Sequence, residues 1–86
     1  MSLEDRSARI NHDSATPVTD QVAADLSAQI TTGRYRPDSR LPSETELAAQ
    51  YGVARVTIRR AVAKLRDQGL LVTVHGRGTL TTPASS

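Results

Sequence analysis

Apolar residues recur with a helical period in three stretches of this sequence. They are Val18, Val22, Leu26 and Ile30 in the first, Leu47, Ala48 and Tyr51 in the second, and Ile58, Ala61, Val62 and Leu65 in the third. Spacings of three and four residues place side chains on one face of an amphipathic helix. We therefore predict three helices, each with one buried face.

Residues that favour helix ends bracket these stretches. Thr16-Pro17 predicts the start of the first helix, because threonine caps a helix and proline is tolerated at its first position. Ser43, followed three residues later by Glu46, predicts a capping box at the start of the second helix. We expect the third helix to span residues 54–68. Glycines follow the three helices at positions 33, 52 and 69.

The pattern changes after the third helix. Residues 70–74 and 79–82 are rich in β-branched and apolar side chains, and the sequence His-Gly-Arg-Gly lies between them. Two such runs around a glycine-containing turn predict a β-hairpin. The second and third helices, joined by a short turn at Gly52, predict a helix-turn-helix. The expected fold over residues 16–82 is therefore mainly α with a small β-hairpin, a winged helix-turn-helix of three helices plus a wing.

Both ends of the chain lack these patterns. Residues 1–15 are polar, of mixed charge and without period, so we expect a mobile N-terminal arm. Residues 83–86 read as a linker or C-terminal tail.

Charge is unevenly distributed along the chain. The formal net charge is only +2, but residues 55–77 hold six arginine and lysine side chains against the single anion Asp67. This segment carries +5 and the remainder −3. Such a basic half is typical of nucleic-acid binders. A solvated basic face is the alternative interpretation of the charge alone.

The third helix presents its arginines away from its apolar stripe. At about 100° per residue, Arg55, Val56, Arg59 and Arg60 spread over the opposite side. A helix of this kind suits the major groove of DNA. Phe and Trp are absent and only two tyrosines occur, which disfavours the aromatic stacking used on single strands and RNA. Duplex DNA is the expected polymer.

Other function classes find little support in the sequence. There is no cysteine, which excludes disulfides and fits a cytoplasmic protein. No apolar run approaches the length of a membrane span. His12 and His75 are far apart and have no metal-ligand spacing around them. We expect no enzyme activity, no cofactor and no metal site.

Two nearly continuous stretches resemble a known family. ITTGRYRPDSRLPSETELAAQYGVARVTIRRAVAKL and DQGLLVTVHGRGTLTT are similar to the N-terminal DNA-binding domain of the GntR family of bacterial transcription regulators. The segment TIRRA resembles the HutC-like branch more than the FadR-like branch. The resemblance implies a winged helix-turn-helix that binds a two-fold symmetric operator as a dimer.

The resemblance also implies roles for individual positions. Arg55 and Arg59 match the family's two arginines one helical turn apart, Ser43 to Thr45 match the start of its middle helix, and the wing's His-Gly pair matches His75 and Gly76. In the family these positions contact phosphates and bases. With the cations nearby, the candidate DNA-binding residues are Arg40, Ser43, Thr45, Arg55, Thr57, Arg59, Arg60, His75, Gly76 and Arg77.

The sequence departs from the family pattern at two points. Ala54 stands where the family usually has serine, and the missing N-cap hydroxyl lowers helix stability by about 1 kcal/mol. Family members normally continue into a C-terminal domain that binds an effector and dimerises, which these residues do not include. We expect effector binding only through such a domain, and weak self-association on DNA.

The leading hypothesis is a sequence-specific, double-stranded-DNA-binding transcriptional regulator that acts as a repressor. Its helix 54–68 would enter the major groove, and its wing 70–82 would contact the backbone or the minor groove. The alternative is a winged-helix protein–protein interaction module whose arginine face meets an acidic partner, because fold alone does not decide function.

Overall fold

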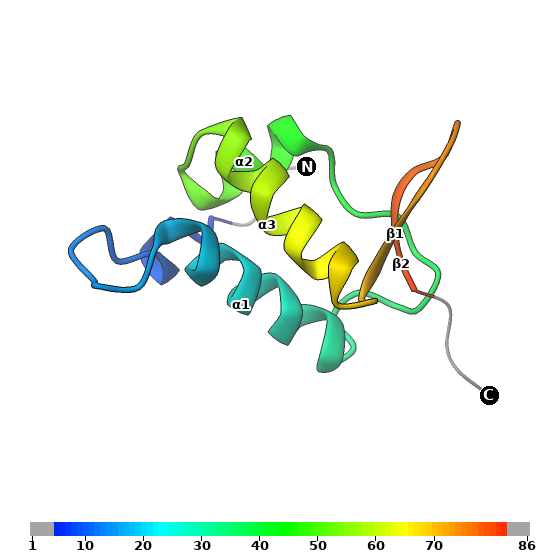
Figure 1. Cartoon of the computed structure of the whole chain (residues 1–86), viewed down its shortest axis with the longest axis horizontal. Coiled ribbons are helices and arrows are strands. Elements are labelled where there is room, and N and C mark those ends of the chain that lie inside the picture. Colours follow the sequence, from blue (N-terminus) through cyan, green and yellow to red (C-terminus); the bar gives the residue numbers. More distant parts are fainter. Residues whose placement is uncertain (1–4, 83–86) are drawn as a thin grey trace.

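Three α-helices and an antiparallel hairpin follow one another along residues 5–82, the part of the chain that the computed structural model describes (Figure 1). A short 3-10 helix, η1, precedes them. The element bounds are η1 Ser7–Arg9, α1 Val18–Thr31, α2 Glu44–Tyr51, α3 Arg55–Asp67, β1 Leu71–Val74 and β2 Gly78–Thr81. The predicted fold class, three helices and a wing, is confirmed.

Helix α3 is the centre of the packing. It contacts α1, α2 and β1, and the stripe predicted from the sequence is its buried face. Ile58, Ala61 and Leu65 are each 1% exposed or less. The remaining core consists of Ile10, Val22, Ala23, Leu26, Leu41, Leu47, Ala48, Tyr51, Leu71 and Leu80. Nearly every element thus contributes apolar area that holds α3 in place.

The turn between α2 and α3 forms as the sequence indicates. Ser43 is the N-cap of α2, and its Oγ accepts a hydrogen bond from the Glu46 N–H at 3.1 Å. Gly52 ends the helix with φ +66°, a left-handed conformation that residues with a Cβ rarely adopt. Ala54 is the N-cap of α3 and supplies no side-chain hydrogen bond, in agreement with the loss of the usual serine.

The start of α1 differs from the prediction by one position. Pro17 is the N-cap, with ψ 144°, and the helix begins at Val18, so Thr16 does not cap it. The Gln21 Nε2 group instead donates to the backbone carbonyls of Thr16 and Asn11, both at 2.8 Å. A side chain from inside the helix therefore fixes the entering chain, and no capping hydroxyl is used.

The hairpin is joined to the helix-turn-helix by a pairing that the sequence pattern did not predict. Strands β1 and β2 pair from Leu71–Thr81 to Val74–Gly78. The segment before α2 lies beside β2 through a bridge between Arg40 and Leu80. The N–H of Leu41 donates to the carbonyl of Thr79 at 2.9 Å. The wing is therefore anchored just before α2 begins.

Part of the segment predicted to be a mobile arm packs against the helices. Arg6 is 7% exposed, and its guanidinium forms two hydrogen bonds with Asp25 of α1, at 2.6 and 3.0 Å. Its N–H donates to the carbonyl of Gln50 at 2.7 Å, and Ile10 joins the core. This segment packs because it buries an apolar side chain and pairs its charge. Residues 1–4 and the predicted tail 83–86 lie outside the described residues.

Candidate nucleic-acid interface

The outward face of α3 carries the arginines predicted from the sequence. Arg55 is the first residue of the helix, and Arg55, Arg59 and Arg60 are all exposed. The packing of α3 directs them outward, because the opposite face is buried against α1, α2 and β1. Among the described residues, Arg55 and Arg60 form no ion pair. Their charges are available to an anionic partner.

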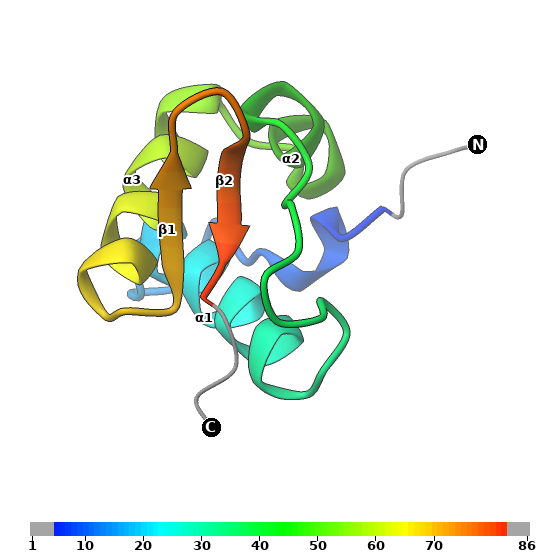
Figure 2. The same ribbon diagram turned by 90° about the vertical axis from the view of Figure 1, so that its right-hand side faces the viewer.

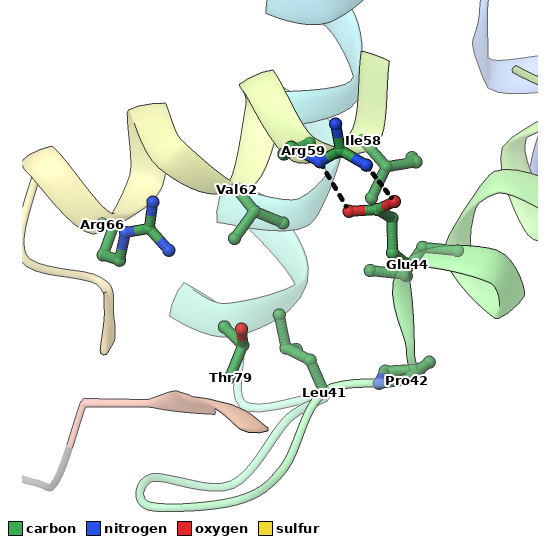
Figure 3. A pocket seen from close by; sticks show the side chains of 9 residues that line it. Leu41, Pro42, Glu44, Ile58, Arg59, Val62, Arg66 and Thr79 are labelled. Atoms are coloured by element: carbon green, nitrogen blue, oxygen red, sulfur yellow. Dashed lines mark hydrogen bonds and ion pairs between the residues drawn. The ribbon is translucent and has the colours of Figure 1, made fainter. Parts of the chain in front are cut away.

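Arg59 has a specific partner, as Figure 3 shows. Its Nε donates to Glu44 Oε2 at 3.1 Å and its Nη2 to Glu44 Oε1 at 2.8 Å. The hydrogen bonds from Arg59 hold the pKa of Glu44 below its ordinary value, and the same contact raises the pKa of Arg59. Both groups therefore remain ionised near neutral pH. The pair fixes the plane of a guanidinium that is otherwise 64% exposed.

A cleft of about 120 Å³ separates α3 from the wing (Figure 3). Its lining includes the apolar side chains of Leu41, Leu47 and Val62 and the two arginines Arg59 and Arg66. Binding sites for drug-sized molecules are usually larger, about 300–1,000 Å³. We interpret the cleft as a crevice between the recognition elements and not as a ligand pocket.

The candidates before α3 lie at the start of α2. Ser43 and Thr45 are exposed there, although the Ser43 hydroxyl already accepts the hydrogen bond from the Glu46 N–H. Arg40 is also exposed and lies beside the wing, where its Nε would be 3.5 Å from a Cβ built on Gly78. The Arg40–Leu80 bridge therefore places this cation between α2 and the hairpin.

The remaining candidates form the turn of the hairpin. His75, Gly76 and Arg77 lie between β1 and β2 and are all exposed, and Gly76 adopts φ +82°. Figures 1 and 2 both show this turn on the same side of the molecule as α2 and the start of α3, with α1 on the opposite side. The structure thus brings the candidates of three separate segments onto one face. Thr57 differs, since it is half-buried on α3.

Two features of this face were not predicted from the sequence. Glu44 was given no role in the sequence analysis, yet it pairs with an arginine fifteen residues later. Lys64, counted among the free cations, forms an ion pair with Asp20 of α1. Neither pairing has a local sequence signal, because each depends on how two helices cross. The sequence indicates such pairing only in general terms, because α1 and α2 carry excess negative charge and α3 carries excess positive charge.

Two other kinds of feature were sought among the described residues. No group of three His, Cys, Asp or Glu side chains within residues 5–82 is placed to hold a metal ion. Over the same residues, no helix has the length and apolar character needed to cross a membrane.

Comparison with known proteins identifies the family. The sequence model of the bacterial regulatory proteins of the gntR family matches residues 18–80, from the first residue of α1 to the wing. This chain belongs to the GntR family.

Several GntR relatives are named repressors. The chain is 44% identical over 70 residues to the HTH-type transcriptional repressor NagR of Bacillus subtilis, which covers 81% of this chain and 29% of NagR. It is 48% identical over 63 residues to the histidine utilization repressor of Klebsiella aerogenes, with 73% and 26% covered. The chain spans less than a third of the length of these curated relatives.

Solved GntR-type structures share the fold. The DNA-binding domain of AraR in complex with operator ORX1 superposes with a TM-score of 0.74 at 43% identity, covering 78% of this chain and 81% of that one. YtrA from Sulfolobus acidocaldarius, a GntR-family transcription factor, gives a TM-score of 0.80 at 32% identity, covering 92% and 83%. The first of these relatives is bound to DNA.

Proposed function

We propose that this GntR domain binds a specific double-stranded DNA sequence and represses transcription. The observation that carries the proposal is the shared face formed by α2, the start of α3 and the hairpin turn (Figures 1 and 2). An arginine-bearing helix fits the major groove while a basic hairpin tip reaches the adjacent backbone or minor groove. A domain bound at an operator represses by excluding other proteins from that DNA. The relatives named as repressors support this direction of control.

In the proposal, Arg55 and Arg59 read guanine edges or adjacent phosphates. The contact with Glu44 uses Nε and Nη2 of Arg59. It leaves the N–H groups of Nη1 and the outer N–H of Nη2 for the O6 and N7 acceptors of a guanine. Glu44 thus holds the guanidinium without consuming the edge that would contact a base.

The other candidates position the domain. Ser43, Thr45 and Arg40 contact phosphates from the start of α2, and His75, Gly76 and Arg77 do so from the wing. Arg60 and Thr57 contact the DNA flanking Arg59. Phosphate contacts fix register and carry no sequence information themselves.

The assembly and its control complete the proposal. Two copies bind the halves of a two-fold symmetric operator in the cytoplasm and associate weakly there, as the family resemblance implies. An effector would act only through a C-terminal domain of the kind that GntR family members carry, which these 86 residues do not include. We place the protein in the HutC-like branch, which the similarity to histidine utilization repressors supports.

Selection from a random duplex library tests this function. The domain should enrich a two-fold symmetric site, and Arg59→Ala should lose the preference at one position of each half-site. Arg40→Ala should weaken binding to all duplexes alike. Arg9→Ala is the matched control, because Arg9 is an exposed arginine on η1, which packs against α2, and it is not among the candidate DNA-binding residues. Failure to enrich any duplex at low salt would overturn the proposal.

A further inference from the structure

Val56 is an apolar side chain in an unusual place. Among the described residues only two large hydrophobic side chains are exposed, Val56 at 43% and Val72 at 38%. Val56 is the second residue of α3, within the turn of a recognition helix that typically contacts base edges. Val56 is therefore exposed on the first turn of α3, where a contact with DNA bases is expected.

The position of Val56 on the helix is almost directly opposite the core. At about 100° per residue, the buried residues Ile58, Ala61 and Leu65 lie roughly 200°, 140° and 180° around the axis from it. Arg59 and Arg60, three and four residues later, flank it on either side of the outer face. When α3 enters a groove with its core side facing the protein, Val56 is the side chain that points into the groove.

Helix stability does not explain this valine. A β-branched residue has a lower helix propensity than alanine, lysine, arginine or glutamate, and an exposed side chain gains little from burial in the folded domain. In a helix valine is largely confined to one χ1 rotamer, so its two methyl groups are held in fixed directions. The valine therefore lowers the stability of α3 in the free protein, and its methyl groups are preorganised for an apolar contact with a partner.

Duplex DNA offers one apolar group at its major-groove edge, the 5-methyl group of thymine. We propose that Val56 packs against this methyl group and so specifies thymine at one position of each half-site, next to the base pair contacted by Arg59. This inference rests on the proposed function. It adds a specificity-determining contact made by shape and apolar area, whereas the arginines discriminate through hydrogen bonds.

Replacing thymine by deoxyuracil tests the contact, because uracil pairs with adenine in the same way and lacks only the methyl group. Each thymine of the selected duplex is replaced singly, and affinity is measured for each variant protein. The wild-type domain should lose about fourfold in affinity at one position of a half-site, the effect of one buried methyl group. Val56→Ala should bind the thymine and uracil duplexes equally, and Val56→Ile should restore the difference.

Val72→Ala is the matched control, because it truncates the other exposed valine, on β1 of the wing. It should keep the wild-type sensitivity to uracil. Thermal unfolding should show that Val56→Ala is at least as stable as the wild type. The inference is overturned if Val56→Ala retains the fourfold loss, or if no thymine is sensitive in a duplex whose binding depends on Arg59. If no duplex is bound at all, the proposed function fails with it.

Discussion

Two arginines of this domain make the same contact with a carboxylate in different surroundings. Arg6 and Asp25 pair with side chains only 7% and 12% exposed. Arg59 and Glu44 pair with side chains 64% and 33% exposed. Water screens the second pair, whereas breaking the first leaves a desolvated charge without its partner. The geometry of an ion pair therefore does not set its contribution to stability.

Substitution of each arginine should separate these cases. Arg6→Ala should lower the free energy of unfolding by about 3 kcal/mol, because the largely buried carboxylate of Asp25 then has no ion-pair partner. Arg59→Ala should leave the unfolding curve unchanged within error. Urea denaturation followed by circular dichroism measures both. Equal losses of stability in the two variants would contradict this expectation. If Arg59→Ala is as stable as the wild type, its altered DNA preference in the selection experiment cannot result from unfolding.

The carboxylate of Asp25 should make stability depend on pH in the acid range. Partial burial alone would raise the pKa of Asp25, but hydrogen bonds from Arg6 and Tyr51 outweigh it and hold the pKa below its ordinary value. A depressed pKa contributes stability that is complete above the unfolded pKa, about 3.9, and is lost as pH falls through the folded pKa. Asp25→Asn should be less stable than the wild type at pH 7.

The difference in stability between the wild type and Asp25→Asn should begin to narrow below about pH 4, where the carboxylate of the unfolded wild type takes up its proton. It should narrow further as pH falls through the lower pKa of the folded state. Melting temperatures recorded at a series of pH values test this. A gap that stayed constant down to pH 2 would show that the charge of Asp25 contributes nothing.

At the scale of elements, the N-terminus of α3 is less well capped than that of α2, the other helix of the helix-turn-helix. Ala54 has the extended conformation of an N-cap, φ −69° and ψ 151°, but no side-chain acceptor, whereas Ser43 provides one to α2. Ala54→Ser should therefore stabilise the domain by about 1 kcal/mol, a rise of about 5 °C in melting temperature. Ser43→Ala should lower stability by a similar amount. Calorimetry measures both, and an unchanged Ala54→Ser variant would show that the first turn of α3 is already satisfied.

The same elements show what a sequence can predict. The apolar stripe of α3, the Ser43 cap and the hairpin depend on residues within a few positions of each other, so their patterns are readable. The packing of Arg6 was missed because its partner Asp25 is nineteen residues away, in an amphipathic helix whose polar face looked solvated. The shared face of Arg40 and Arg77 likewise depends on the bridge to Leu80, which no local pattern indicates.

At the scale of the whole molecule, the sequence overstated the free charge of the basic segment. Residues 55–77 carry +5, but Arg59 is paired with Glu44 and Lys64 with Asp20. The other four cations of this segment remain exposed and without an ion pair among residues 5–82: Arg55, Arg60, Arg66 and Arg77. The field directed at DNA therefore comes from fewer cations than the count suggests, and these lie along the outer face of α3 and the wing tip.

The salt dependence of DNA binding should report how many of these cations contact phosphates. Each phosphate neutralised contributes about 0.9 to the slope of log affinity against log salt concentration. We expect a slope of several units for the wild type, reduced by about one in Arg60→Ala and again in Arg77→Ala. Arg9→Ala should leave the slope unchanged, since its charge is on η1. Fluorescence anisotropy titrations at four or five salt concentrations provide the slopes.

A flat wild-type slope would mean that the arginine face does not contact phosphates and would favour an acidic protein partner. Equal reductions from Arg9→Ala and Arg77→Ala would show that net charge, and not the wing contact, governs binding.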